Sequence, residues 1–590
     1  MENALKSGEF LLKQVTPESV FIPEEFDEEQ RMIAQTCQDF IEAEVYPNLE
    51  QLEKGDRKLM EEILKKSGEL GLMGIAIPEE FGGFGQSFVT QMLAAETTGA
   101  GFSFSVAYMA HCGIGTMPIM YFGNEDQRSR YIPRLATGEL IGAYCLTEPG
   151  AGSDANSGKS SATLDEDGRN YILNGQKMWI TNAGFADIQI VFAKIDNDRV
   201  LSAFIVEKDY PGVVIGPDEH KMGIKGSSTA QIYYNDVKVP VENLLGKRGE
   251  GFRIALSILH MGRIKLGANV IGAAKKAIND SVQYATERKQ FNTAIASFGA
   301  IKSKLAMQVV KSVATESAIY RVSRDIDNLA GRYVAENCEK GRASIDAISY
   351  YAVEAALLKV YGSEMLDFVV DEAVQIHGGM GYSAEMAVEK AYRDSRINRI
   401  FEGTNEINRL LLVDTAMKRA MKGDFDLFGE AEKVFADPAG APAAATSGES
   451  YGEEMLRYTG NFKKCALMAI HAASSTFGKK LVHEQEILTE ISDIMTSAYL
   501  AESLVLRTLK REMTQGEDAV FRAITNIFIF NTASEIRRSA LGAIFSTLSP
   551  DEAEPVADAI EKLTSVRGVN LKEEGRLIAD KLIEDGSYKF

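Results

Sequence analysis

The sequence predicts a mainly helical protein with a β-domain in its centre and an extra helical domain at its C-terminal end. Helical periodicity runs from about residue 26 to residue 139 and returns from about residue 251 to residue 421, whereas short apolar runs separated by Gly, Asp and Pro lie between these regions. At 590 residues the chain is also too long for a single core. We therefore expect a helical domain over 1–139, a β-domain over 140–245, a helical bundle over 246–425, a linker over 426–450 and a helical domain over 451–590.

Individual elements follow from the same patterns. In the first domain, residues 61–71 and 126–137 are expected helices, because their apolar positions recur at helical spacing and a glycine ends each of them. In the centre, the apolar runs predict strands over 188–192, 201–206 and 231–239.

The C-terminal region begins with a stretch of small residues, from Ala436 to Ser450, that predicts a linker. Beyond this stretch, apolar stripes at three- and four-residue steps predict helices over 489–512, 519–545, 551–563 and 571–584. Because this domain shows no group of catalytic residue types, we interpret it as a module for packing and dimerisation.

Composition excludes several classes of function. The net charge of −20 argues against nucleic-acid binding and against general attachment to anionic lipid. Five scattered cysteines indicate reduced thiols rather than a disulfide framework, and the six histidines show no metal-ligand spacing, so we expect no metal. No apolar run reaches the roughly 18 residues that a membrane span needs, so we expect no transmembrane segment.

A polar turn after a short apolar run is the most informative motif. Residues 140–146 read as a strand, Glu148-Pro149 ends it, and two glycines free the backbone around Ser153. Thr147 and Ser153 therefore offer N–H groups and hydroxyls to a flat polar ring and an anion. Taken alone, the same stretch also fits a turn capped by Ser-Asp ahead of an exposed loop.

A second motif carries the single tryptophan of the chain. The pair Asn174-Gly175 lies between apolar residues and predicts a β-hairpin that bears Trp179 and Thr181. Two residues apart on a strand, these side chains share a face, which suits an aromatic wall beside a hydroxyl. A lone tryptophan also fits simple core filling.

The third motif places a glutamate where the chain must turn. Glu402 lies between Phe401 and Gly403, and burial beside an aromatic ring raises the pKa of a carboxylate until it can act as a base near neutral pH. The alternative is an ordinary glutamate at a helix start, with Thr404 as the helix cap.

Together these motifs resemble the acyl-CoA dehydrogenase family. With two further motifs, Glu287–Phe291 and Gln375–Tyr382, they occur in the family's order and spacing, and the resemblance covers about residues 26–421. The other three are Tyr144–Asp154, Trp179–Thr181 and Phe401–Asn405. The continuation to Phe590, the start of the chain and the position of Glu402 resemble the very-long-chain and ninth-member-like subgroup. The resemblance implies a helical domain, a β-barrel-like domain and a four-helix bundle, followed by the extra C-terminal helical domain.

The resemblance also implies FAD, clamped between the β-domain and the bundle. Residues bordering the flavin ring would be Tyr144, Leu146, Thr147, Trp179 and Thr181, with Gly152 and Ser153 near the pyrophosphate. A second set would reach the FAD of the neighbouring subunit: Arg288, Phe291, Gln375, Gly378 and Gly379. Thr404, Asn405 and Glu406 would lie at the adenosine end. One departure is Gly299, where medium-chain members carry a glutamine.

In the implied reaction Glu402 removes the α-proton of an acyl-CoA thioester while hydride leaves the β-carbon. The residues implied on the substrate side are Ser153, Phe401 and Gly403 near the reacting atoms, and His260 and Arg263 near the CoA portion. Arg263 has the alternative role of a helix salt bridge. At the acyl pocket, the small apolar residues Val106, Ala107 and Ala110 predict a preference for long acyl chains. The side chains of Tyr108 and Met109 could refill part of that space.

The remaining expectations concern partners and location. The resemblance implies a homodimer that passes electrons to an electron-transferring flavoprotein, with peripheral membrane contact left open. The N-terminus has neither a signal core nor transit-peptide character, which points to a bacterial cytoplasmic protein or a mature organellar form. Two alternatives stay open: an acyl-CoA oxidase, and a family member with an additional role in assembling a respiratory complex.

Overall fold

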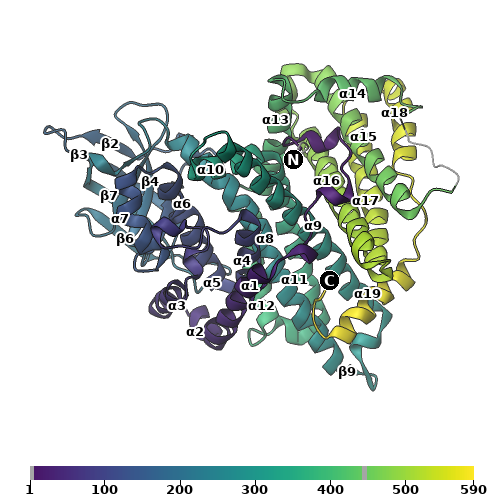
Figure 1. Cartoon of the computed structure of the whole chain (residues 1–590), viewed down its shortest axis with the longest axis horizontal. Helices are drawn as coiled ribbons and strands as arrows, with labels where there is room; N and C mark the ends of the chain where they lie inside the picture. The colour runs from purple at the N-terminus through teal and green to yellow at the C-terminus, as the bar shows by residue number, and fades with distance from the viewer. Residues whose placement is uncertain (1–4, 442–447) are drawn as a thin grey trace.

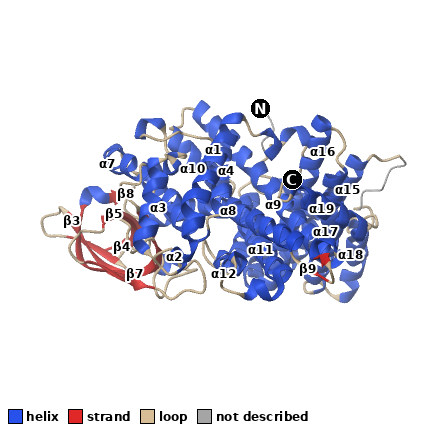
Figure 2. Ribbon diagram, turned by 90° about the horizontal axis from the view of Figure 1, so that it is seen from below, coloured by secondary structure: helices blue, strands red, loops and turns tan. Residues whose placement is uncertain are grey.

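The computed structural model describes residues 5–441 and 448–590. The β-domain lies at one end of an elongated molecule, the C-terminal helices lie at the other end, and a helical bundle joins them (Figure 1). Strands gather almost entirely at the first end (Figure 2). The predicted fold class, mainly helical with a central β-domain and an extra C-terminal helical domain, is confirmed.

The N-terminal helices cover one side of the β-domain and the adjoining end of the bundle. Side-chain caps fix the first residues of several of these helices. Asp27 accepts a hydrogen bond from the N–H of Gln30, and Ser87 accepts one from the N–H of Thr90. The helices are α1 (Glu28–Phe40), α2 (Leu49–Glu53), α3 (Arg57–Glu69), α4 (Phe88–Gly99), α5 (Phe102–Met109), α6 (Met117–Phe122) and α7 (Glu125–Ala136).

Within residues 142–245, all of them described, eight strands form one mixed sheet in the order β6-β7-β3-β2-β4-β5-β8, with β1 paired to β4. β1 and β4 run parallel, with Tyr144 opposite Ile190. The strands are β1 (Gly142–Cys145), β2 (Ser161–Leu164), β3 (Asn170–Thr181), β4 (Ile188–Ile195), β5 (Ser202–Glu207), β6 (Val213–Asp218), β7 (Thr229–Pro240) and β8 (Leu244–Leu245).

The hairpin turn predicted at Asn174-Gly175 is wrong. β3 runs through this pair without turning, and its pairing with β7 shifts register between Leu173 and Gly175. A Cβ on Gly175 would lie 2.2 Å from the hydroxyl oxygen of Ser160, so the glycine permits a close approach of two backbones at a β-bulge. The turn between β2 and β3 instead contains Gly168, whose φ is +67°.

A second irregularity in β3 affects Trp179. The register against β7 shifts again between Lys177 and Ile180, and Trp179 has a φ of +59°. β3 therefore has one extra residue here, which interrupts the alternation of side chains along the strand. The prediction that Trp179 and Thr181 share a face depended on that alternation. The bulge leaves the indole 54% exposed at the end of the strand.

The bundle is built around two 37-residue helices, α8 and α9. Its elements are α8 (Gly251–Glu287), β9 (Lys289–Gln290), β10 (Thr293–Ala294), α9 (Gly299–Ala335), α10 (Lys340–Tyr350), α11 (Ala352–His377), α12 (Ala387–Ser395) and α13 (Asn405–Met421). Among the described residues α8 is long and apolar enough, by length and composition, to cross a membrane, which corrects the expectation that no run reaches that length. Since 67% of its apolar window is buried inside the protein, α8 has the pattern of a core helix.

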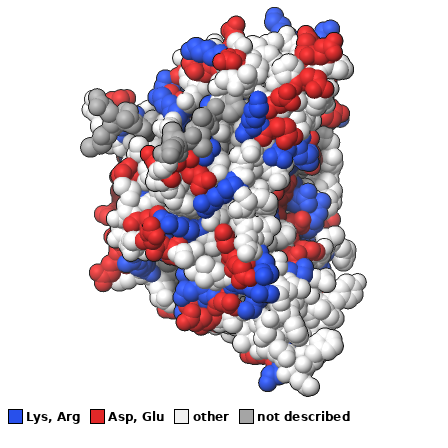
Figure 3. All heavy atoms as spheres, turned by 90° about the vertical axis from the view of Figure 1, so that its right-hand side faces the viewer, with Lys and Arg blue, Asp and Glu red and all other residues white. Residues whose placement is uncertain are grey.

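The C-terminal helices share one continuous apolar core with the bundle, with α4, α6 and α7, and with one face of β1, β4 and β5. The opposite face of these strands packs with α1, α3 and α5 in a second core. The outer face of the C-terminal helices carries charges of both signs, interspersed (Figure 3). The helices are α14 (Leu427–Ala436), α15 (Tyr451–Phe477), α16 (Gln485–Gln515), α17 (Ala519–Phe545), α18 (Pro550–Leu563) and α19 (Leu571–Asp585). α14 replaces the first part of the predicted linker, because its apolar face, including Leu427 and Ala431, is buried. Residues 442–447 of that linker lie outside the described residues.

A buried ion-pair network ties the chain termini to the bundle. Arg507 of α16 is 1% exposed and donates to the carboxylates of Glu24, in the N-terminal arm (residues 5–27, before α1), and Glu316, in α9. It also donates to the main-chain carbonyl of Phe590, at 3.4 Å. Lys275 of α8 pairs with the same Glu316. Segments from both ends of the sequence therefore meet at one buried guanidinium.

We expect Gly272→Ala to destabilise the protein, because α4 and α8 cross in direct backbone contact at this residue. A Cβ on Gly272 would lie 1.7 Å from the carbonyl oxygen of Glu96. Forcing the helices apart costs about 1–3 kcal/mol, which should lower the thermal melting temperature by several degrees. The control is Gly331→Ala in α9, where no atom lies within 4 Å of the added methyl group and a small stabilisation is expected. Equal melting temperatures for the two variants would contradict this packing.

Candidate active site

The segment bearing Glu402 adopts a left-handed turn between a 3₁₀ turn, Arg396–Arg399, and the start of α13. Glu402 has a φ of +58° and Gly403 a φ of +84°. A non-glycine residue in this conformation is strained and persists only where its surroundings hold it. The hydroxyl of Thr404 accepts a hydrogen bond from the N–H of Ile407 and caps α13, so the turn ends at a fixed helix start.

Buried side chains hold this turn through its carbonyl groups. Arg263 Nε of α8 donates to the Glu402 carbonyl at 3.1 Å. Lys359 Nζ of α11 donates to the Gly403 carbonyl at 2.8 Å, and Asn408 Nδ2 donates to the same oxygen at 2.7 Å. Three side chains from three helices therefore fix the backbone that directly follows the Glu402 side chain.

The carboxylate itself points into the protein. Among the described residues, its Oε2 is buried and has no hydrogen-bond partner. Burial raises the pKa of Glu402 to about 7, against the opposing charges of Arg263 and Lys359. Gly262 makes room for the group, since a Cβ there would lie 2.9 Å from Glu402 Oε2. A carboxylate with this pKa and no partner is suited to accept a proton near neutral pH.

His260 and Arg263, which we expected near the CoA portion of a substrate, lie beside this turn. Arg263 is 4% exposed and its guanidinium contacts His260 Nδ1 at 3.1 Å. Burial and the neighbouring cation lower the pKa of His260 to about 3, so the imidazole is neutral. The structure thus places Arg263 at the base of the Glu402 turn rather than in a helix salt bridge.

The residues at the end of β1 face the turn that carries Glu402. Tyr144 is buried, and the charges of Glu402 and Arg263 both act on the pKa of its hydroxyl, which burial raises well above its usual range. Leu146 is buried, and the N–H of Met178 donates to the Thr147 carbonyl at 2.9 Å. This bond brings Thr147 next to the bulge that carries Trp179. Beyond it, Gly152 and Ser153 lie exposed.

These surroundings fit a flat ring with an anionic tail. Trp179 exposes its indole at a strand end, and a Cβ on Gly150 or Gly152 would meet no atom within 4 Å, so that loop leaves open space for a phosphate to approach its backbone. Thr404, Asn405 and Glu406 lie at the N-terminus of α13, where the helix dipole favours negative charge. The β-domain and the bundle therefore both present groups that can hold a flavin nucleotide.

A second group of expected cofactor residues lies far from this centre. Arg288, Gln375, Gly378 and Gly379 are exposed at the far ends of α8 and α11, and Phe291 is 89% exposed beside them. The rings of Tyr284 and His377 stack at 4.2 Å and hold these two helix ends together. Because a helix rises 1.5 Å per residue, Arg288 lies roughly 38 Å along α8 from Arg263. These residues do not reach the Glu402 centre of their own chain.

The expected acyl-pocket residues lie on α5 and the π-helical turn that follows it. Val106 lines a cavity of about 60 Å³, together with Asn269 of α8 and Asn398, four residues before Glu402. Ala107 is fully buried, and its carbonyl accepts a hydrogen bond from Asn182 Nδ2; Ala110 is 8% exposed. The Tyr108 hydroxyl donates to the Leu72 carbonyl.

Sequence reasoning missed three residues of the site. Gly262, Lys359 and Asn408 each lie inside a helix, where their spacing matches ordinary helical periodicity. Lys359 offered the one usable signal, because it interrupts the apolar run from Ala355 to Val360 in a helix that is otherwise buried there.

Comparison with known proteins agrees with this geometry. Models of the acyl-CoA dehydrogenase N-terminal, middle and C-terminal domains match residues 27–139, 143–237 and 249–417, and a further acyl-CoA dehydrogenase C-terminal domain model matches residues 461–562. A probable acyl-CoA dehydrogenase of Bacillus subtilis (strain 168) is 43% identical over 99% of this chain and 98% of its own length. The very long-chain specific acyl-CoA dehydrogenase of Rattus norvegicus mitochondria is 36% identical over 78% of this chain and 71% of its own.

A solved structure shows the same architecture over the whole chain. The acyl-CoA dehydrogenase of Bacillus anthracis, complexed with FAD, superposes with a TM-score of 0.96 at 44% identity and covers 99% of this chain and 100% of its own. The Glu402 carboxylate between α8, α11 and β1, the matched domain models and this similarity lead to one conclusion: the chain belongs to the acyl-CoA dehydrogenase family.

Proposed function

We propose that this protein binds FAD and oxidises the Cα–Cβ bond of long-chain acyl-CoA thioesters, with Glu402 as the catalytic base. The observation that carries the proposal is a buried carboxylate without a partner, held on a strained turn between the bundle and the β-domain. Family membership makes the protein a flavin-dependent oxidoreductase that acts on CH–CH bonds. Bound FAD supplies the acceptor for the hydride that leaves the β-carbon.

The residues of the chain supply the proton transfer. The Glu402 carboxylate takes the α-proton, and the negative charge that develops on the thioester oxygen needs a hydrogen-bond donor. Among the described residues, no acceptor binds the N–H of Glu402, which leaves this donor free for that oxygen. Arg263 and Lys359 hold the turn by its carbonyls, so the carboxylate keeps its position while its charge changes.

A preference for long acyl chains is supported by the space beyond the base. The cavity at Val106 is also lined by Asn269 and Ala273 of α8, which lie roughly 10 and 16 Å along the helix from Gly262. Phe102 closes the side formed by α5. We infer that the acyl chain runs from the reacting carbons towards this cavity. The similarity to very long-chain specific enzymes favours the same preference.

The partner that removes the electrons is part of the proposal. Family resemblance favours an electron-transferring flavoprotein, and the dry surroundings of Glu402 are consistent with a reduced flavin that is shielded from solvent and oxygen. An acyl-CoA oxidase would instead release one hydrogen peroxide for each acyl-CoA consumed under air. Counting peroxide separates the two alternatives.

A homodimer is supported by the remote cofactor residues. Arg288, Phe291 and the turn at Gly378 cannot reach the centre of their own chain, yet they present the charge, exposed ring and free backbone that a nucleotide needs. An area with few charges lies at the lower end of the face in Figure 3, the end at which Figure 1 places β9. We infer that this end of the bundle meets a second copy of the chain.

We expect kcat/KM to rise about tenfold per pH unit below about pH 7 and to level off above it, because Glu402 must lose its proton to act as the base. The charged and titratable groups that face it are Arg263 and His260 of α8, Lys359 of α11 and Tyr144 of β1. Glu402→Gln should retain FAD and lose about three orders of magnitude in turnover.

The matched control for this test is Glu385→Gln, at an exposed glutamate outside the site, which should keep the activity and pH profile of the wild type. The measurements are initial rates with a dye acceptor between pH 5.5 and about 9 and the flavin absorbance of each purified protein. Turnover by Glu402→Gln near the wild-type level would rule out the assignment of the base.

Chain-length preference should depend on Val106. We expect kcat/KM for palmitoyl-CoA to exceed that for butyryl-CoA, since each buried methylene contributes about 0.8 kcal/mol. Val106→Phe should fill the cavity and shift the optimum towards shorter chains. Val214→Phe, the same substitution at a half-exposed position of β6, should leave the optimum unchanged. A wild-type optimum at butyryl-CoA would refute the preference.

The oligomeric state can be measured directly. Light scattering should give about twice the chain mass of 64.6 kDa for the FAD-loaded protein. The physical reason is that Arg288 and the turn at Gly378 can complete a nucleotide site only in a second copy of the chain. A monomer that retains FAD stoichiometrically, or a tetramer, would contradict the proposed dimer.

A further inference from the structure

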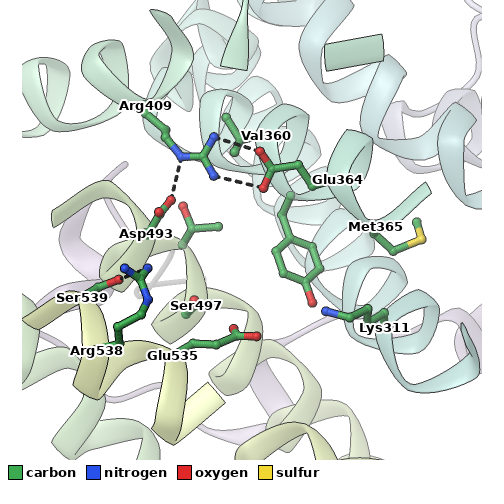
Figure 4. Close-up of a pocket in the computed structure, with 12 residues that line it drawn as sticks. Lys311, Val360, Glu364, Met365, Arg409, Asp493, Ser497, Glu535, Arg538 and Ser539 are labelled. Atoms are coloured by element: carbon green, nitrogen blue, oxygen red, sulfur yellow. Dashed lines mark hydrogen bonds and ion pairs between the residues drawn. The ribbon is translucent and has the colours of Figure 1, made fainter. Parts of the chain in front are cut away.

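A cavity lies between part of the bundle and part of the C-terminal domain. It has a volume of about 310 Å³ and is lined by residues of α9, α11 and α13 on one side and of α16 and α17 on the other (Figure 4). Arg409 of α13 forms part of its wall and pairs with a carboxylate from each side.

The guanidinium of Arg409 binds a carboxylate on each side. It forms a fork with Glu364 of α11, with N–O distances of 2.9 and 3.0 Å, and its Nε donates to Asp493 of α16 at 2.7 Å (Figure 4). A bidentate pair with a third, charge-assisted bond fixes both the position and the plane of the guanidinium. Arg409 is 15% exposed, so solvent screens these contacts only partly.

From Glu364 the contacts continue to the catalytic turn. Glu364 Oε1 accepts a hydrogen bond from Asn405 Nδ2 at 3.0 Å, and Asn405 Oδ1 accepts one from Lys359 Nζ at 2.7 Å. Lys359 Nζ also donates to the Gly403 carbonyl at 2.8 Å. An unbroken series of charged and polar contacts therefore joins Asp493, in the C-terminal domain, to the residue that follows the base.

The same series carries electrostatic coupling. Lys359 is fully buried, which lowers its pKa to about 7, and the carboxylates of Glu402, Glu364 and Glu406 oppose that change. Lys359 in turn favours the charged form of Glu402. Any change in the charge balance between Glu364 and Arg409 must therefore act on Lys359, and through Lys359 on Glu402.

We propose that Asp493 is a positioning residue of the active site: through Arg409, Glu364, Asn405 and Lys359, the C-terminal domain sets the geometry and the ionisation of Glu402. The proposal rests on the proposed function, because it requires Glu402 to be the base. It assigns the C-terminal domain a role in the reaction besides packing and dimerisation.

The test replaces Asp493 by Asn in the full-length, FAD-loaded protein. Loss of the Asp493 charge makes the net charge of the linked side chains one unit more positive. The more positive surroundings stabilise the charged form of the Glu402 carboxylate. The acid limb of the kcat/KM profile should therefore move to lower pH by a few tenths of a unit. We also expect kcat to fall about threefold to tenfold, and amide hydrogen exchange of residues 401–408 to accelerate.

The matched control is Asp580→Asn. Asp580 of α19 pairs with Lys302 of α9, an ion pair between the same two parts of the molecule that does not reach the catalytic turn. This variant should keep the wild-type pH profile and the wild-type exchange of residues 401–408. Asp493→Glu, which keeps the charge, should restore the pH profile.

Arg409→Lys separates position from charge. Lysine keeps the cation but cannot form the three directed bonds, so exchange of residues 401–408 should accelerate while the acid limb stays in place. If Asp493→Asn and Asp580→Asn match each other in both the pH profile and the exchange, Asp493 is an interface ion pair only and the proposal fails.

Hydrogen exchange also distinguishes this failure from failure of the proposed function. If the wild-type protein dehydrogenates no acyl-CoA, the proposed function falls, and the proposal about ionisation of a catalytic base falls with it. If wild-type activity is present and exchange in residues 401–408 is unchanged by Asp493→Asn, only the positioning role is overturned.

Discussion

The structure depends on one constraint, which is to keep the Glu402 carboxylate buried and free of partners. An unpaired buried carboxylate is unfavourable, and a left-handed glutamate adds backbone strain. Neither would persist without compensation from the surrounding fold. Arg263, Lys359 and Asn408 supply it by holding carbonyl groups of the turn rather than the carboxylate. The reactive group thus remains unpaired while the backbone that carries it is fixed.

α8 provides the frame for this arrangement. Near its start, Gly262 leaves space for the carboxylate and Arg263 binds the turn; further along, Asn269 lines the cavity next to α5. At Gly272 the helix meets the backbone of α4 with no side chain between them. This one helix therefore sets the distance between Glu402, the expected path of the acyl chain and the residues at its far end that we propose contact a nucleotide.

Buried charge links the peripheral parts of the chain to that frame. Arg507 joins the N-terminal arm, α9 and the C-terminal residue, and Arg409 joins α11, α13 and α16. Removing one partner of such a pair leaves an uncompensated buried charge, which makes each contact sensitive to its neighbours. The C-terminal domain shares the apolar core of the bundle as well. It is therefore mechanically and electrostatically part of the molecule that holds the active site.

The sequence by itself determined the order of helical and β regions and the family, because local periodicity and short motifs reside in contiguous residues. It failed where the answer depended on distant segments. Asn174-Gly175 has the composition of a turn, yet contact with Ser160 made it a bulge, and α14 formed within a predicted linker because α15 covers its apolar face. The partners of Glu402 were likewise decided by tertiary structure. Gly262 and Lys359 lie 140 and 43 residues before it in the sequence, and only the packing of α8 and α11 brings them to the turn that carries Glu402.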